Sequence, residues 1–304
     1  MNGTNPKVIS VQKYNIMKKA TKVKEQIEEI KKRGLNIDCS DDLIESYFSI
    51  VGYYSLGFYL FPFEKSYPSI VNRTHKYKEN ARFSDVILLY KANTELRFII
   101  LEYLSFFENF FKTLLIYKVS NKYHNNPTWF VDNTILKIDI GNFNKIYNGL
   151  KNSHKPIYNH HKNNPKDKYA PAWKTLEYLT FGQNQYIYKS LLSKKLKKEI
   201  AEEFNVCDIN MFLTYLQNAV DIRNICAHGG PLFDYNSKNP IKRINSVVGT
   251  LQMSESSLLY TLKHLANSMK NIDKIKSNIS SDFISDVYSV INKSKYKSIR
   301  HFFK

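Results

Sequence analysis

The chain has 304 residues, of which 43% are hydrophobic and 24% are charged. This apolar content is enough to bury a sizeable core, so wholesale disorder is excluded. The formal net charge is +18, because 45 Lys and Arg residues face 27 Asp and Glu residues. Such an excess, accompanied by many Tyr and Phe residues, favours a polyanion with accessible bases as the partner. The alternative is that the charge only aids solubility.

Three cysteines, Cys39, Cys207 and Cys226, are an odd number without paired spacing. They argue against a disulfide framework and against a cysteine-rich zinc site. The first residues lack the apolar core of a signal peptide, and no apolar stretch reaches transmembrane length. We therefore expect a soluble cytoplasmic protein without a membrane segment, a metal or a small-molecule cofactor.

Apolar residues at helical spacing predict helices in the first half of the chain. These helices cover residues 15–33, 41–51 and 85–123. Gly34 ends the first helix and Ser40 caps the second. The other segments are read as a loose basic tail over 1–14, aromatic residues over 51–63 and a polar linker over 64–82. The aromatic residues are assigned to the core, with a platform for stacking RNA bases as the alternative.

Helical spacing continues in the second half, after core residues Trp129 and Phe130. Residues 132–170 are rich in Asn and Lys and are read as a basic surface loop over the path of a nucleic acid. We assign His160, His161 and Lys162 of this loop to RNA binding, because the histidine spacing fits no zinc ligand pair. Further helices are expected to begin at Ala172, Tyr186 and Lys194, and to cover 208–228, 254–270 (capped by Ser254) and 281–293.

Four lysines at one helix start oppose the helix dipole, which points to an anionic partner. We assign them to RNA binding, although a solvated run of charge is the alternative: Lys194, Lys195, Lys197 and Lys198. The sequence has no alternating strands, no Gly-rich phosphate loop and no internal repeat. The predicted fold is all-α, with a helical bundle over 81–304 and an N-terminal helical segment over 1–80 packed on it.

The most informative stretch is Arg223-Asn224-Ile225-Cys226-Ala227-His228, at the end of the helix that Asp208 caps and directly before Gly229. Asn224 and His228 are four residues apart and share a helix face. A histidine in the last turn of a helix is favoured in its charged form and can transfer protons near neutral pH. By spacing alone, however, an arginine and a histidine five residues apart also occur by chance.

RNA carries its own nucleophile, the 2′-hydroxyl, so cleavage needs only proton transfer and stabilisation of the phosphorane. His228 can act as general acid or base, Arg223 can hold phosphate oxygens, and Asn224 can orient either. The predicted reaction is metal-independent and leaves 2′,3′-cyclic phosphate and 5′-hydroxyl ends. One histidine is short of a two-proton mechanism, and a two-fold dimer would supply the second.

Five sequence blocks occur in a fixed order between about residues 20 and 235. They are QIEEIKKRGLNID, VGYYSLGFYLFPF, LYKANTELRFIILEYLSFFENFFKTLL, WKTLEYLTFG and AVDIRNICAHGGPLFD. Together they resemble the bacterial abortive-infection Abi-D/Abi-F (Abi_2-like) phage-resistance family. RNICAH is similar to the R-N-x-x-x-H signature of HEPN ribonucleases, an all-helical superfamily.

The resemblance implies a HEPN-like bundle, a homodimer through the motif helices and the shutdown of phage-infected cells. It also implies control by a cognate structured noncoding RNA, as an antitoxin controls a toxin. Arg223, Asn224 and His228 match the catalytic signature. Glu108 matches the acidic position of a supporting helix, with Lys112 where arginine is common. The chain departs from the family at Ser105, where an acid is usual, and at the glycines after His228.

Two other functions stay open on the sequence. The first is a noncatalytic RNA-binding protein that forms a ribonucleoprotein with a noncoding RNA, for which the charge and the Lys- and Tyr-rich segments speak. The second is recognition of nucleotides rather than of a polymer, which the missing phosphate loop disfavours.

Overall fold

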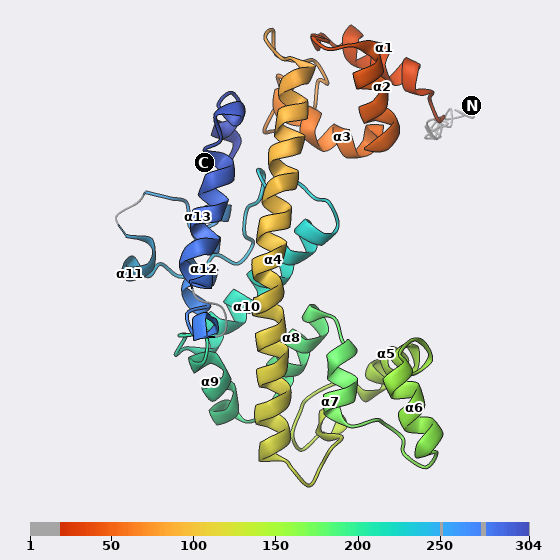
Figure 1. Cartoon of the computed structure of the whole chain (residues 1–304), viewed down its shortest axis with the longest axis vertical. Coiled ribbons are helices and arrows are strands. Elements are labelled where there is room, and N and C mark those ends of the chain that lie inside the picture. The colour runs from red at the N-terminus through yellow and green to blue at the C-terminus, as the bar shows by residue number, and fades with distance from the viewer. Residues whose placement is uncertain (1–18, 250–251, 275–277, 304) are drawn as a thin grey trace, which may run out of the picture. The chain divides into compact units, whose positions relative to one another are not determined.

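The computed structural model describes residues 19–249, 252–274 and 278–303. Within these ranges the protein consists of thirteen α-helices and short 3₁₀ turns, with isolated β-bridges but no strand (Figure 1). The all-α prediction is therefore confirmed. The predicted tail over residues 1–14 lies outside the described part of the chain.

The chain divides into two compact units between Val86 and Ile87, near the start of the long helix α4 (Phe83–Lys122). The N-terminal unit contains three further helices and one 3₁₀ turn, which are α1 (Val23–Lys32), α2 (Asp41–Ile50), α3 (Tyr53–Leu60) and Phe61–Phe63. The C-terminal unit contains the remaining helices, and the candidate functional residues on helices lie there.

Local hydrogen bonds set the ends of the first helices. The backbone N–H of Leu43 donates to Ser40 Oγ (3.4 Å), which confirms the predicted cap of α2. Gly34, with φ +95°, follows α1 in the left-handed conformation that ends many helices. Among the described residues α1 begins later than predicted, because Glu25 accepts the backbone N–H of Lys22 (2.8 Å) and so caps the helix there.

The aromatic stretch that forms α3 is only partly core. Leu56, Tyr59 and Leu60 are buried, whereas Tyr54 and Phe58 are 82% and 44% exposed. The prediction of a core role is thus wrong for the outer face of α3. A surface helix buries only the stripe of side chains that faces its neighbours, whatever the composition of its other side.

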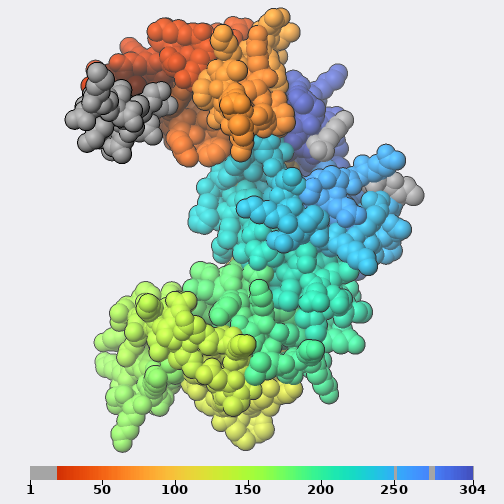
Figure 2. Space-filling model, turned by 180° about the vertical axis from the view of Figure 1, so that it is seen from behind, coloured from red at the N-terminus to blue at the C-terminus, as the bar shows by residue number. Residues whose placement is uncertain are grey.

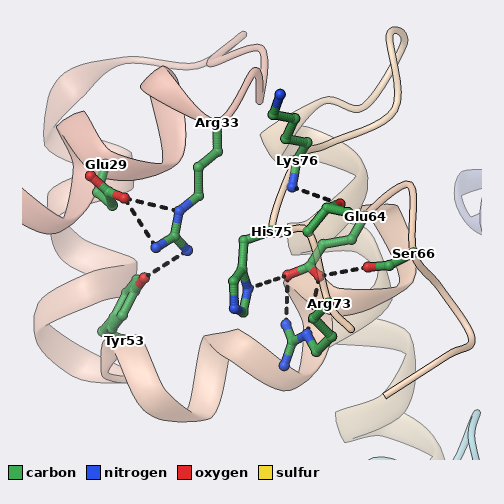
Figure 3. A network of polar contacts seen from close by, with 9 residues as sticks. Glu29, Arg33, Tyr53, Glu64, Ser66, Arg73, His75 and Lys76 are labelled. Carbon is green, nitrogen blue, oxygen red and sulfur yellow. Dashed lines mark hydrogen bonds and ion pairs between the residues drawn. The ribbon is translucent and has the colours of Figure 1, made fainter. Parts of the chain in front are cut away.

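The polar segment between α3 and α4 is folded by a charged network rather than being a linker (Figure 3). Glu64, 2% exposed, accepts hydrogen bonds from Arg73 Nε (3.1 Å) and Ser66 Oγ (3.2 Å). His75 Nδ1 lies 3.4 Å from the same carboxylate, and the Arg73 guanidinium lies 4.4 Å from the ring centre of Phe61. Burial would raise the pKa of Glu64, but the bonds from Arg73 and His75 outweigh it and lower that pKa.

Glu64→Ala should destabilise the N-terminal unit, because it leaves Arg73 without its carboxylate. We expect a loss of about 1–3 kcal/mol in the free energy of unfolding, measured by urea denaturation followed by circular dichroism. Glu29→Ala is the control, since it removes a carboxylate that is 49% exposed from its ion pair with Arg33 (Figure 3). It should change stability by less than about 0.5 kcal/mol. Equal losses in the two variants would contradict a central role for Glu64.

The C-terminal unit is arranged along the long helix α4 (Figure 1), which buries apolar side chains such as Leu96, Phe107 and Phe111. Its other helices are α5 (Ile140–Ser153), α6 (Lys155–Asn163), α7 (Ala172–Thr175), α8 (Phe181–Ser190), α9 (Lys194–Glu202), α10 (Ile209–Ala227), α11 (Asn245–Val248), α12 (Leu258–Ser268) and α13 (Ile279–Ile291). The predicted starts at Ala172 and Lys194 are correct. The start predicted at Tyr186 is late, because Thr180 Oγ1 accepts the N–H of Gln183 (3.3 Å) and caps α8 earlier.

A cluster of buried aromatic rings joins α4, α8 and α10. The ring centre of Phe111 on α4 lies 6.0 Å from that of Phe181 and 6.2 Å from that of Phe212. Phe204, directly after α9, lies 4.9 Å from Phe212. Each buried ring contributes about 1.5–3 kcal/mol, so this cluster fixes α10 against α4.

Residues 132–170 contain two helices, so the prediction of a surface loop is wrong. Asp139 Oδ1 accepts the N–H of Asn142 (3.1 Å) and caps α5. Phe143, Tyr147 and Ile157 form a buried apolar stripe that the high Asn and Lys content conceals in the sequence. α5 and α6 lie beside α7 and away from α4 (Figure 1). Their yellow-green and green atoms lie at the lower left of the face seen in Figure 2.

The last helices pack on α10 and α4. α12 begins after Ser257, whose Oγ accepts the N–H of Tyr260 (3.4 Å), so the predicted cap at Ser254 is wrong. Tyr103 of α4 stacks on Phe283 of α13, with ring centres 4.7 Å apart.

His264 of α12 is fully buried, and its Nδ1 lies 2.8 Å from the hydroxyl of Tyr215 on α10. Burial lowers the pKa of His264 to about 4, with a smaller contribution from Arg243. Because an unfolded histidine titrates near pH 6.5, its neutral form stabilises the fold fully above that pH and the stability is lost as the pH falls toward 4.

His264→Asn should therefore weaken the acid dependence of stability. Between pH 7 and 4.5 the variant should lose on the order of 2 kcal/mol less than the unsubstituted protein, in urea denaturation at each pH. The exposed His301, changed to Asn in the same way, should leave the dependence unaltered. The same slope in the His264 variant and the unsubstituted protein would contradict the assignment.

Candidate active site

The motif stretch forms the last turn of α10, which is fixed at both ends. At its start, Asp208 Oδ1 accepts the N–H of Met211 (2.7 Å), as predicted. At its end, the N–H of His228 donates to Asn224 O (2.9 Å) and that of Gly230 to Ile225 O (2.9 Å). The second bond is the six-to-one contact that closes a helix with a left-handed residue.

Gly229 is that left-handed residue, with φ +79°. A side chain there would be strained, and an added Cβ would lie 3.2 Å from Arg97 Nη1. The predicted glycine cap is therefore present. It turns the chain sharply away from the helix axis and leaves His228 exposed at the tip of α10.

Arg223 is tied to α4 by an ion pair with Glu108. Arg223 Nε lies 3.0 Å from Glu108 Oε2, Nη2 lies 3.4 Å from Oε1, and Nη1 donates to Asn224 Oδ1 (3.1 Å). The side chains of Arg223 and Glu108 are 29% and 19% exposed, so the pair is partly desolvated. Three of the five guanidinium N–H groups are thereby engaged. The structure brings Glu108, Arg223 and Asn224 together, and His228 follows one helical turn later on α10.

Lys112 is not brought to this group. Its Nζ lies 2.8 Å from Glu177 Oε1, in the 3₁₀ turn after α7. Lys112 occupies the next turn of α4 after Glu108, but its ammonium is directed to Glu177. Within the described residues, its contacts link α4 to the α7 region.

Two residues of α4 that the sequence reading missed support the motif from the other side. Asn93 is fully buried; its Nδ2 donates to Gly230 O (3.2 Å), and its Oδ1 accepts the N–H of Leu232 (2.7 Å). These bonds hold the chain that leaves His228. The sequence offered one sign of this role, because Asn93 and Arg97 are polar residues four apart on an otherwise apolar helix.

Arg97 lies against Gly229, and most of its donors have no hydrogen-bond partner among the described residues. Its Nη2 donates to Thr94 Oγ1 (3.1 Å), and its Nε is buried with no hydrogen-bond partner in the described structure. Cys226, nearby on α10, has its pKa raised to about 12 by burial, despite an opposing effect of Arg97. A thiol of that pKa is no nucleophile, so Cys226 is a packing residue.

The four lysines at the start of α9 differ in their environments. Lys194, Lys195 and Lys198 are exposed, and Lys198 pairs loosely with Glu202 (3.8 Å). Lys197 is half-buried; its Nζ donates to Lys189 O (2.7 Å), and burial together with Lys194 lowers its pKa. Lys197 is thus a structural bridge from α9 to α8, and the other three stay accessible.

The histidines assigned to RNA binding are buried, each with 9% exposure. His161 Nε2 lies 2.7 Å from the hydroxyl of Tyr147, and burial lowers the pKa of His161. His160 Nε2 lies 2.9 Å from Asp167 Oδ2. Both side chains hold α6 in place, so the interpretation of an RNA-facing histidine pair is wrong, whereas Lys162 is exposed.

No three His, Cys, Asp or Glu side chains among the described residues are grouped so that they could hold a metal ion. None of the described helices combines the length and apolar character needed to span a bilayer.

The model of one protein family, described as Abi-like protein (Abi_2), matches residues 46–234. The chain belongs to the Abi-like family. The match covers Glu108 on α4 and the whole motif on α10, and it ends before α11. No curated protein and no solved structure matches the chain significantly. Membership of the Abi-like family suggests a function in abortive infection.

Gly229→Ala should disturb the end of α10, because it adds a Cβ at positive φ and against Arg97. We expect a loss of about 1–2 kcal/mol, seen as a lower midpoint of thermal unfolding. Gly149→Ala is the matched control, since Gly149 lies inside α5 with open space around its Cα. That variant should be stabilised by about 0.5–1 kcal/mol. A neutral Gly229→Ala would show that the cap is not strained by a side chain.

Proposed function

We propose that this Abi-like protein is a metal-independent RNA endonuclease with a HEPN-type active site at the end of α10. The observation that carries the proposal is an exposed histidine, His228, one helical turn after an arginine and an asparagine that an ion pair holds in place. This arrangement supplies a proton-transfer group and a phosphate-binding cation on one rigid element. The net charge of +18 favours RNA as the substrate.

In the proposed reaction the 2′-hydroxyl of RNA attacks the adjacent phosphorus and the 5′-oxygen leaves. One protonatable group takes the proton from the 2′-hydroxyl, and another gives a proton to the leaving oxygen. The bond that forms closes a 2′,3′-cyclic phosphate, and the bond that breaks releases a 5′-hydroxyl. His228 serves as one of the two groups.

The phosphorane carries extra negative charge on its non-bridging oxygens, and two arginines are suited to bind it. Arg223 retains two N–H groups beyond its bonds to Glu108 and Asn224. Arg97, which approaches Gly229 from α4, adds a second guanidinium, whose Nη1 has no hydrogen-bond partner among the described residues. Because α4 and α10 form one packed core, both cations are preorganised before RNA arrives.

A homodimer would complete the two-proton chemistry. A two-fold axis near the end of α10 brings two copies of His228 to one cleft, so one can act as base and the other as acid. We further propose that a cognate structured noncoding RNA binds the protein and restrains the nuclease, which would act in the cytoplasm as an antiviral toxin.

A noncatalytic RNA-binding role is the second candidate. The observation in its favour is that Glu108 and Asn224 already engage much of the Arg223 guanidinium. Tight binding of RNA that weakens steeply with salt, without turnover, would identify this role.

His228→Ala should abolish cleavage of a labelled single-stranded RNA by the purified protein in the presence of a chelator. We expect a rate loss of about 10²–10⁴-fold, because general acid–base catalysis contributes that much. The products should carry a 2′,3′-cyclic phosphate and a 5′-hydroxyl. A single 2′-deoxy substitution at the cleaved nucleotide should block the reaction by removing the nucleophile.

The matched control is His124→Ala, since His124 is an exposed histidine of the same unit on the segment after α4. It should cleave at the unsubstituted rate. Equal cleavage by the His228 variant, or products with a 3′-hydroxyl, would refute the proposed mechanism.

A further inference from the structure

A stripe of polar side chains runs along α10 from its middle to His228. Gln217, Asp221, Asn224 and His228 follow one another at spacings of four, three and four residues, which places them on one helix face. All four are exposed or half-buried. The buried face of α10 is formed by other residues, so this stripe is open and leads directly to the proposed catalytic histidine.

The far end of the stripe opens into a groove of about 460 Å³ between α8 and α10. Polar and apolar surface contribute about equally to its lining, and its polar side chains are Gln185, Tyr186, Lys189, Thr214, Gln217 and Asn239. Gln217 lies eleven residues before His228, or about 16 Å along the helix axis. A short oligonucleotide spans that distance.

One side of the groove is formed by the loop after α10, which hydrogen bonds to Asn218 hold in place. Asn218, 1% exposed, donates from Nδ2 to Thr214 O (2.8 Å) and Asn239 O (2.9 Å). Its Oδ1 accepts from the hydroxyls of Tyr235 (2.7 Å) and Ser237 (2.6 Å). All four hydrogen-bonding positions of this buried amide are filled, so the loop is held firmly and Asn239 is fixed at the groove.

The side chains inside the groove suit a nucleobase. Tyr186 is 51% exposed and presents its ring, on which any base can stack. Gln185 Nε2 donates to Gln217 Oε1 (3.1 Å), and Gln217 Nε2 donates to Asp221 Oδ1 (2.9 Å). This chain orients the two amides and leaves Gln185 Oε1 and one N–H of each amide for the edge of a base.

The charges around the groove indicate how an RNA strand would lie in it. Lys189 is exposed and forms no ion pair with any described residue. Its backbone carbonyl accepts a hydrogen bond from Lys197 Nζ, which brings a second lysine close. Positive charge therefore gathers on the α8–α9 side, whereas the Asp221 carboxylate lies on the α10 side. A phosphate is attracted to Lys189 and repelled by Asp221. The RNA backbone would therefore lie on the Lys189 side, with its base toward Gln185 and Gln217.

We propose that this groove binds one nucleotide of single-stranded RNA, with its base stacked on Tyr186, while the same strand reaches His228 along α10. The proposal rests on RNA being the ligand of the proposed function, but it concerns binding and not cleavage. It assigns a role to α8 and to the middle of α10, where the sequence motif gives no information.

The test is the affinity of full-length His228→Ala protein for a fluorescent twelve-nucleotide RNA of mixed sequence, by anisotropy at fixed salt. Adding Tyr186→Ala should weaken binding about tenfold or more, because a stacked base is lost. Tyr186→Phe keeps the ring and should stay within about twofold of the parent. Lys189→Ala should reduce the salt dependence of binding by about one counterion.

Tyr158→Ala is the matched control, since Tyr158 on α6 is a similarly exposed tyrosine (56%) that lines none of this groove. It should bind RNA as the parent does. An effect of Tyr186→Ala no larger than that of Tyr158→Ala would overturn the proposal. The proposal would also be overturned if Tyr186→Ala turned a dimer into a monomer in sedimentation but left RNA affinity unchanged. In that case a second copy of the chain, and not RNA, would occupy the groove.

The same variants separate this inference from the proposed function. If the chain with His228 intact cleaves RNA and Tyr186→Ala leaves both KM and affinity unchanged, the groove assignment is wrong and the nuclease stands. If that chain cleaves no RNA but binding depends on Tyr186, the nuclease is wrong and the groove stands.

Discussion

The ion pair between Glu108 and Arg223 is the constraint on which the candidate site depends. It joins α4 and α10 through residues 115 positions apart, and the rings of Phe111 and Phe212 pack between the same two helices. A guanidinium held by two carboxylate contacts cannot rotate freely, so its remaining donors and the Asn224 amide point in fixed directions. Loss of either partner would leave a half-buried charge and a mobile motif.

The backbone at the end of α10 is held in one conformation by a glycine and by hydrogen bonds from α4. Gly229 bends the chain in a conformation that other residues adopt with strain, and Asn93 then captures the backbone on both sides of Pro231. Exposure, a fixed backbone and nearby guanidinium groups thus coincide at one residue, although each has a separate structural cause.

Two segments of polar composition were predicted as surface loop and linker, but buried side chains fold both of them. The Asn- and Lys-rich segment over 132–170 looks like a surface loop, yet Phe143 and Tyr147 give it a buried stripe that draws His161 inside. Likewise, the segment after α3 has few apolar residues, but the burial of Glu64 organises it. A single carboxylate or a few rings are enough to fold a polar segment, and average composition does not register them.

The sequence by itself determined the all-α class, the capping of α10 by Asp208 and the glycine turn behind His228, because these follow from local periodicity, capping and φ preference. The family resemblance singled out Glu108 and Lys112, but only tertiary structure decided that Glu108 reaches Arg223 whereas Lys112 turns to Glu177. It also decided that Arg97 and Asn93 stand behind the motif and that Tyr186 faces a groove on the same side of α10. These relations join helices far apart in the chain, and only the packing of α4, α8 and α10 around their shared aromatic core sets them.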